Sequence, residues 1–350
     1  MAIKVSYDHN SLKKICNGTI IATIDYNLDL PSDLSKCKLS NYIVYELKNI
    51  YFNKESDIFK IEVDDEFLGY IFPVQSLDGD RHIEDEWEKM FSYMAASWII
   101  KNKNITDEKS FLDILYKTDL QSNEKDYNPP AVLIINTFEK SFNINNYRLS
   151  LLLYGYQQEY EDCMINNIKR SDGFLDGEKK INLKNNKKLT DRHLTEIIFN
   201  RLIFSSETMP YRFLILYQSF EYLMKLNQID KIKNYKKSFK NLDLTNPKIL
   251  KTATRYISNL DSEKNHLKDV FEKVKILPNY RDDINLFYSD YKNVLGIDET
   301  PNEYLVIYSV RNNLFHSYRN YFENTDFDKL LYKAFLVLIE LLISKYNMKS

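Results

Sequence analysis

Glycine is scarce in this chain of 350 residues. It occurs seven times, about 2% of positions, against the ~7% of ordinary proteins. No grouping of the seven forms G-x-G-x-x-G or G-x-x-x-x-G-K-[ST], the loops that let backbone amides approach a phosphate closely. The sequence therefore argues against dinucleotide-fold oxidoreductases and P-loop nucleotide hydrolases.

Cysteine and histidine are also few. The three cysteines, Cys16, Cys37 and Cys163, have no C-x-x-C spacing, so neither a disulfide framework nor a cysteine zinc site is expected. None of the five histidines stands in an H-E-x-x-H frame. We therefore expect no metal and no cofactor, and a protein that works in a reducing cytoplasm.

The chain has little that resembles a membrane segment. Its longest apolar run, 334–343, is interrupted by Glu340 and is about half as long as the ~20 residues of a membrane-spanning helix. The first ten residues lack the charged-then-apolar pattern of a secretory signal. We expect no membrane association and no export. The 44% of hydrophobic residues is enough for about two domains with separate cores.

Charge is distributed unevenly, although the formal net charge is −2. Residues 53–126 carry 18 acidic and 9 basic side chains, whereas residues 225–255 carry 2 acidic and 9 basic. A basic segment that also contains aromatic residues can follow a phosphate backbone and stack on bases. The RNA-binding candidates are Lys231, Lys233, Lys236 and Lys237. The alternative is a solvated helix surface, which such charge runs commonly form.

The first half alternates apolar and polar residues with a period near two, which predicts β-strands. The expected strands are 19–30, 41–52, 57–63, 67–74, 131–138 and 143–155, and the expected helices are 84–101, 106–120 and 157–169. Two acidic groups, 64–66 and 78–80, stand where a strand pair must turn and are interpreted as turns. We predict an α+β domain over residues 1–170, with a sensing or regulatory role.

The second half has a helical period. A polar stretch with two glycines, 171–189, is the predicted linker. Beyond it, helices are expected at 190–205, 209–225 and onward, 247–259, 261–275, 280–295, 300–322 and 325–346. Residues 190–350 are therefore predicted to form an all-α helical bundle. Within its first turn, Asp191, His193 and Glu196 are typical of an exposed capped turn rather than of a metal site.

The helix predicted at 300–322 carries an unusual group of polar side chains. At about 100° per residue, Arg311 falls in the middle of an apolar face. A guanidinium buried there without an acceptor would cost several kcal/mol. Asn312 and His316 lie one turn apart at the border of that face. A cation, an amide and an imidazole are thus expected at one edge of a buried stripe.

Two interpretations of this group are open. In the first, Arg311 pairs with a carboxylate of the bundle such as Glu221, while Asn312 and His316 face water. In the second, the three side chains form a reactive site, and Glu221 orients Arg311 or His316.

The string RNNLFH at 311–316 resembles the Arg-Asn-x-x-x-His motif of the HEPN superfamily. These all-α domains include many prokaryotic ribonucleases of toxin–antitoxin, CRISPR and phage-defence systems. The flanking string YSVRNNLFHSY and the aromatic helix at 211–226 are most similar to the Apea-like HEPN branch. His316-Ser317-Tyr318 also resembles the extended Arg-x4-His-x-Tyr form of HEPN toxins. The resemblance covers residues 190–346 and leaves 1–160 unassigned.

The resemblance implies an endoribonuclease that needs no metal. Arg311 would hold the scissile phosphate, Asn312 would orient the phosphate or the imidazole, and His316 would transfer a proton to or from the RNA. Attack by the 2′-hydroxyl would restrict cleavage to RNA and leave a 2′,3′-cyclic phosphate. Because HEPN nucleases pair two domains around one cleft and this chain has one motif, a homodimer is implied.

The resemblance also implies a setting and partners. The protein would be a toxin or an anti-phage effector of abortive infection, controlled by a phage-derived trigger protein or by an antitoxin. In HEPN toxins paired with a nucleotidyltransferase antitoxin, the tyrosine that matches Tyr318 can be modified. The alternative is a catalytically silent HEPN module that binds RNA, a nucleotide or a partner protein.

Overall fold

The structure is a computed structural model of the 350-residue chain, which divides into two compact units, Met1–Lys184 and Asn185–Ser350. It describes residues 3–8, 11–26, 39–49, 58–77, 85–116, 130–136, 142–158, 180–187, 197–206, 208–240, 245–259, 262–271, 274, 281–295, 303–321 and 325–346. The first unit combines sheets and helices, and the second is helical. At this level the predicted order, α+β and then helical, is confirmed.

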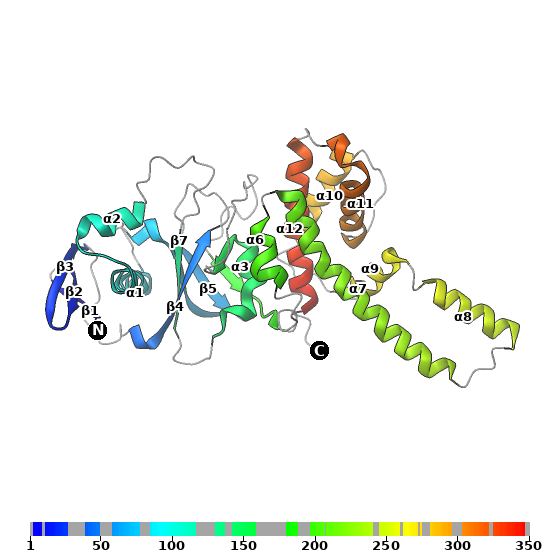
Figure 1. The fold of residues 1–350 in the computed structure, drawn as a ribbon, viewed down its shortest axis with the longest axis horizontal. Coiled ribbons are helices and arrows are strands. Elements are labelled where there is room, and N and C mark those ends of the chain that lie inside the picture. The colour runs from blue at the N-terminus through cyan, green and yellow to red at the C-terminus, as the bar shows by residue number, and fades with distance from the viewer. Residues whose placement is uncertain are drawn as a thin grey trace. The chain divides into compact units, whose positions relative to one another are not determined.

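The first unit contains two β-sheets, which Figure 1 shows in blue to green. A three-stranded antiparallel sheet has the order β1 (Ile3–Asp8), β2 (Ser11–Cys16) and β3 (Thr19–Asp25). A six-stranded sheet has the order β8-β4-β7-β6-β5-β9, in which β5 and β9 are parallel and the other neighbours antiparallel. Its strands are β4 (Tyr42–Asn49), β5 (Phe59–Val63), β6 (Glu66–Pro73), β7 (Pro130–Asn136), β8 (Tyr156–Gln158) and β9 (Lys180–Leu183).

Strand β7 separates the two hydrophobic cores of this unit. Val132 and Ile134 belong to the core that includes the buried residues of α1 (Glu86–Asn102). Leu133 and Ile135 belong to the other core. Because successive side chains of a strand point to opposite faces, an apolar run such as that of β7 serves both cores. The remaining helical elements are η2 (Leu39–Asn41), η3 (Val74–Leu77), α2 (Glu108–Tyr116), η4 (Ile144–Tyr147) and α3 (Arg148–Leu153).

Several elements of the first unit differ from the prediction. Residues 144–153 were expected as a strand but form η4 and α3. Four leucines of α3 are buried, and a short, continuous apolar run does not distinguish a strand from a buried helix. Part of the predicted linker, Lys180–Leu183, is β9, paired with β5. Of the helix expected at 157–169, residues 157 and 158 belong to β8, and the rest lies outside the described residues.

Two hairpin turns show how local sequence sets backbone shape. Asp64 and Asp65 join β5 to β6 with φ of 53° and 65°, which confirms the turn predicted there. Asn17 and Gly18 join β2 to β3 with φ of 50° and 87°. Asn-Gly is a strong signal for a tight hairpin, so β2 was detectable from this dipeptide although its alternation is weak. The acidic group 78–80 lies outside the described residues.

The second unit is built on long helices, drawn in green to red in Figure 1. It begins with a π-helical turn, η5 (Ile198–Leu202), and α6 (Ile203–Ser205). The helices that follow are α7 (Met209–Phe239), α8 (Pro247–Asn259), α9 (Glu263–Phe271), α10 (Arg281–Leu295), α11 (Glu303–Tyr321) and α12 (Thr325–Tyr346). The bounds of α8 and α12 match the predicted ones.

Helix α12 forms the centre of this unit. Every residue from Ala334 to Ser344 is less than 9% exposed, and α12 packs against α7, α10 and α11. A helix that is apolar on all sides must be covered on all sides, and in this unit neighbouring helices supply that cover. Among the described residues, no helix is long and apolar enough to cross a membrane.

Candidate active site on helix α11

Helix α11 buries one stripe of apolar side chains against the bundle. Val306, Ile307, Val310 and Leu314 are at most 6% exposed. Arg311 lies beside this stripe, about 85° from its centre by helical rotation, and its side chain is 21% exposed. The expectation that Arg311 lies in the middle of the apolar face was wrong. That expectation left Val306 and Val310 out of the apolar face. Because both valines are buried, the buried side of α11 is centred away from Arg311.

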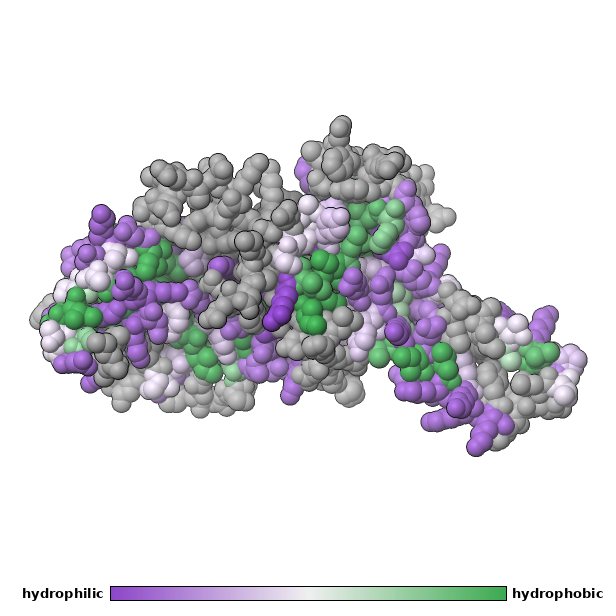
Figure 2. Space-filling model, in the orientation of Figure 1, coloured by the Kyte–Doolittle hydropathy of each residue, from purple (hydrophilic) through white to green (hydrophobic). Residues whose placement is uncertain are grey.

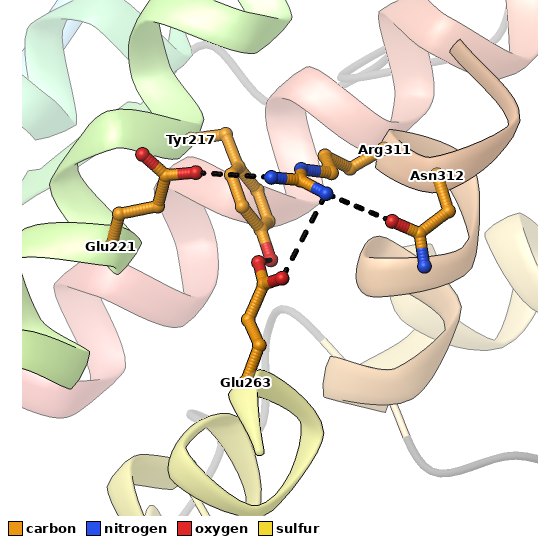
Figure 3. A network of polar contacts seen from close by, with 5 residues as sticks. All are labelled: Tyr217, Glu221, Glu263, Arg311 and Asn312. Carbon is orange, nitrogen blue, oxygen red and sulfur yellow. Dashed lines mark hydrogen bonds and ion pairs between the residues drawn. The ribbon is translucent and has the colours of Figure 1, made fainter. Parts of the chain in front are cut away.

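Acceptors from three helices surround the Arg311 guanidinium (Figure 3). Its Nη2 lies 3.4 Å from Oε1 of Glu221 on α7, and its Nη1 lies 3.7 Å from Oε2 of Glu263 on α9. Nη1 also donates to Oδ1 of Asn312 over 3.0 Å. The pairing with Glu221 that the sequence allowed is therefore present, and a second carboxylate, Glu263, joins it.

These contacts leave the guanidinium incompletely bonded. The distances to the two carboxylates are longer than the ~2.7–2.9 Å of a strong charge-assisted hydrogen bond, and neither carboxylate forms a two-pronged pair. Nε is buried and has no hydrogen-bond partner among the described residues. Because Nε is buried, a further acceptor would reach this unfilled donor if the side chain moved.

Two aromatic rings, from α7 and from α11 itself, hold the guanidinium. Its central carbon lies 4.7 Å from the ring centroid of Phe315 and 5.7 Å from that of Tyr217, within the range of cation–π attraction. Tyr217 is 1% exposed, whereas Phe315 is 60% exposed. The Tyr217 ring is thus held in the core, whereas solvent reaches the Phe315 ring.

Tyr217 also fixes Glu263. Its hydroxyl donates a hydrogen bond to Oε1 of Glu263 over 3.1 Å. Burial, and then the negative charge of Glu263, raise the pKa of Tyr217 above its ordinary value, so the hydroxyl stays a neutral donor. Glu263 is the first residue of α9, where the helix dipole favours a carboxylate. Phe220 of α7 stacks on Phe271 of α9 with ring centroids 4.7 Å apart, and both rings are buried.

His316 and Tyr318 stand apart from this network. His316 lies one turn beyond Asn312 on α11 and is exposed, while Asn312 is half-buried. The described residues supply no hydrogen bond or ion pair to His316. The side chain of Tyr318 lies outside the described residues, although its backbone is part of α11. The structure therefore brings together Arg311, Asn312 and Glu221 and leaves the imidazole in solvent.

The four lysines proposed from charge alone fall into two groups on α7. Lys231 forms an ion pair with Asp269 of α9, so it ties two helices together. Lys233, Lys236 and Lys237 are exposed, and Lys233 lies 3.7 Å from the equally exposed Asp230. The three exposed lysines are available to an outside partner.

The described residues contain no cluster of metal ligands. No group of three or more histidine, cysteine, aspartate or glutamate side chains there could hold a metal ion. Residues 191–196, which contain Asp191, His193 and Glu196, lie outside the described part of the chain.

Two residues of the site were not found from the sequence. Tyr217 precedes Glu221 by one helical turn, a spacing that places both on one face of α7, so a signal existed. Glu263 had no such signal, because its position beside Arg311 depends on how α9 packs against α7 and α11.

Comparison with known proteins identifies no relative: no family model, curated protein or solved structure matches this chain. The resemblance to HEPN domains therefore stays a prediction from the motif at 311–318.

Proposed function

We propose that this chain is a metal-independent endoribonuclease of the HEPN type, in which Arg311, Asn312 and His316 act on a phosphodiester of RNA. The observation that carries the proposal is the incompletely bonded guanidinium of Arg311 next to Asn312, on the same helix as an exposed imidazole one turn further on. Arginine recognises phosphate through its fixed fork of donors, and histidine titrates near neutral pH in its unperturbed form.

In the proposed reaction the ribose 2′-oxygen attacks phosphorus and the bond from phosphorus to the 5′-oxygen breaks. One histidine accepts the proton of the 2′-hydroxyl, and another donates a proton to the departing 5′-oxygen. Arg311 stabilises the negative charge that develops on the phosphate. The products are a 2′,3′-cyclic phosphate and a 5′-hydroxyl. Because each chain has one motif, a homodimer supplies the second His316.

In this proposal the two carboxylates keep the free enzyme in a resting arrangement. Glu221 and Glu263 are 46% and 30% exposed, so their ion pairs with Arg311 are partly screened by water and weak. A bound phosphate competes with them for the guanidinium, and Glu221, the more exposed, is the one that gives way.

We further propose the biological setting that the motif implies. The protein acts in the cytoplasm as a toxin or as an effector of abortive infection against phage. Its N-terminal unit senses a trigger or restrains the nuclease. An antitoxin that modifies Tyr318 would block the site, because Tyr318 follows Arg311 by seven residues on α11, about 20° away by helical rotation.

The first experiment is a cleavage assay on the full chain in EDTA. A set of structured and unstructured labelled RNAs is incubated with the wild-type protein and with His316→Ala. We expect cleavage by the wild type alone, with 2′,3′-cyclic phosphate ends, and a loss of about 10²–10⁴-fold in the variant. Equal cleavage by both proteins, or by neither, would refute the nuclease.

The second candidate function is a catalytically silent module that binds RNA, a nucleotide or a partner protein. The observation that favours it is the enclosure of Arg311 between Glu221 and Glu263, with His316 outside the network. Arg311→Lys separates the two candidates. Lysine keeps the charge of a structural ion pair but loses the two-pronged phosphate contact, so cleavage falls steeply if the nuclease is correct.

A further inference from the structure

The C-terminal part of α7 carries a basic stripe on one face. Lys233, Lys236, Lys237 and Lys240 follow one another at spacings that place them within about 100° of rotation. All four are exposed. Lys231 lies on the opposite side of the helix, where it pairs with Asp269. In Figure 2, hydrophilic residues (purple) are prominent at this end of the helical unit, beside smaller hydrophobic patches (green).

A second basic stripe lies on the next helix. Lys248, Lys251 and Arg255 recur on one face of α8, and all three are exposed. Neither α8 nor residues 231–242 contain an acidic side chain, and Asp243 is the one acid between residues 231 and 260. Each stripe is therefore strongly positive, which attracts a polyanion.

Helix α7 connects the first stripe to the candidate active site. Glu221 of α7 contacts Arg311, and Lys233 and Lys240 follow Glu221 by 12 and 19 residues on the same helix, ending at its C-cap. At 1.5 Å per residue, the stripe lies about 18–28 Å from Glu221 along the helix axis. At roughly 3.4 Å per stacked nucleotide, that distance corresponds to about five to eight nucleotides.

The chemistry of the stripe favours a phosphate backbone over a lipid surface. A membrane-binding helix inserts large apolar side chains next to its basic ones. Between Lys233 and Lys240 the helical rotation places no large apolar residue on the stripe. On α8, the exposed Leu250 lies about 130° from the centre of the basic face. The charges of the stripe are thus presented to water, and the nearest exposed apolar side chains on α7, Ile229 and Ile232, precede it.

We propose that the basic hairpin, defined as residues 231–240 of α7 and its C-cap and 247–259 of α8, binds the sugar-phosphate backbone of the RNA substrate away from the scissile bond. The inference rests on the proposed function and extends it to a substrate class. The preferred substrate is an RNA that continues for at least about five nucleotides beyond the cut on one side. Shorter RNAs reach Arg311 but not the hairpin.

Binding is tested in the full chain with His316→Ala, so that RNA is not consumed. Fluorescence anisotropy of a labelled 20-nucleotide RNA is measured across a salt series for this protein and after adding Lys236→Gln and Lys237→Gln. The slope of log K against log salt is negative, and each lost phosphate contact reduces its magnitude by about 0.7. We expect the slope to fall by about 1.4, which is about 25-fold weaker binding at 0.1 M salt.

The matched control changes two exposed lysines of the N-terminal unit, Lys101→Gln and Lys109→Gln, which removes the same charge elsewhere. We expect its slope to equal that of the parent. A length series, with three to fifteen nucleotides on either side of the cut, should show the hairpin defect in RNAs longer than about five nucleotides and not in shorter ones.

Three results would overturn the inference: equal slopes for hairpin and control variants, a defect that is independent of RNA length, or lysine-dependent binding to phosphatidylserine vesicles without binding to RNA. The proposed function fails separately. If the wild type cuts no RNA but the hairpin variant has the reduced slope, the nuclease is wrong and the RNA-binding hairpin stands. If the wild type cuts RNA and the slopes are unchanged, the nuclease stands and the hairpin does not bind the substrate.

Discussion

Two enclosed cations, one in each unit of the molecule, are bonded differently. In the N-terminal unit, Lys14 is 5% exposed, and its Nζ donates to the carbonyl oxygens of Lys103 and Ile105 at 3.0 and 3.3 Å. In the helical unit, Arg311 is 21% exposed, its two ion pairs are long, and its Nε has no partner among the described residues.

This difference separates a cation that serves the fold from one that is open to a ligand. Lys14 satisfies the carbonyl groups at the end of α1, where the helix dipole favours a positive charge. Removing it takes the ammonium donor from the buried carbonyl of Ile105, whereas the carbonyl of Lys103 still accepts from the Ile105 N–H. Removing Arg311 leaves two carboxylates that are partly in water and lose little. Activity and stability, measured together on variants of both cations, test the difference.

Among variants of the two cations and their neighbours, the largest expected effect is the loss of RNA cleavage in Arg311→Ala. Losing the phosphate contact should lower the cleavage rate by about 10²–10³-fold. Stability should change by less than about 1 kcal/mol, since half-exposed ion pairs contribute little. Rates on labelled RNA and urea unfolding of the same preparation measure the two effects. A variant that loses stability but keeps its cleavage rate would mean that Arg311 serves the fold and not the reaction.

Lys14→Met should give the opposite profile. Methionine fills the space but removes the ammonium donor from the buried carbonyl of Ile105, while the carbonyl of Lys103 keeps its bond from the Ile105 N–H, so the free energy of unfolding of the N-terminal unit should fall by about 1–3 kcal/mol. The rate of RNA cleavage below the unfolding transition should stay within about twofold, because this side chain belongs to the other unit. Unchanged stability would show that water replaces the ammonium group and that the contrast between the two cations is weaker than the geometry indicates.

A smaller effect is expected when one carboxylate beside Arg311 is neutralised. Glu263→Gln keeps an acceptor for the Tyr217 hydroxyl but removes a charge that competes with phosphate. Since a partly exposed pair contributes about 0.2–1 kcal/mol, RNA affinity should rise by up to about fivefold. Asp290→Asn, which breaks an ion pair with Lys333 elsewhere in the same unit, is the control. An affinity that falls in Glu263→Gln would mean that Glu263 supports binding.

The smallest expected effect is a loss of stability at alkaline pH, which should occur in both units. Burial raises the pKa of Tyr70 in the N-terminal unit and of Tyr217 in the helical unit, with nearby acids adding to the rise. A raised folded-state pKa means that the stabilisation is complete below the unfolded value of about 10 and is lost as pH rises above it. Urea midpoints should therefore fall above about pH 10. Tyr217→Phe should reduce that fall for the helical unit and leave that of the N-terminal unit unchanged.

The prediction of secondary structure succeeded where the pattern was long and local. The helices at 209 and 325 begin at the expected residues, because a period of 3.6 over many residues is hard to mistake. It was wrong at 144–153, where a short apolar run fits either a strand or a buried helix. It also placed β9 in a linker, since the pairing of Lys180–Leu183 with β5 joins residues more than a hundred positions apart.

The same division holds at the candidate site. The motif placed Arg311, Asn312 and His316 on one helix, and Glu221 was named as a partner from its apolar surroundings. The buried face of α11 was not predictable from the residues around Arg311. Val306 and Val310 also compete for the core, and their burial leaves the arginine at the edge of the buried face. Glu263 enters from a separate helix and has no counterpart in the local pattern.

The sequence by itself determined the order of the two halves, the main helices, the tight turns and the chemical types gathered on α11. These follow from periodicity, backbone preference and residue identity, which act over a few neighbouring positions. The tertiary structure decided which face of α11 is buried, which two carboxylates meet Arg311, and which lysines of α7 remain exposed. Those outcomes depend on competition among distant side chains for one core, and that competition is settled when the helices pack.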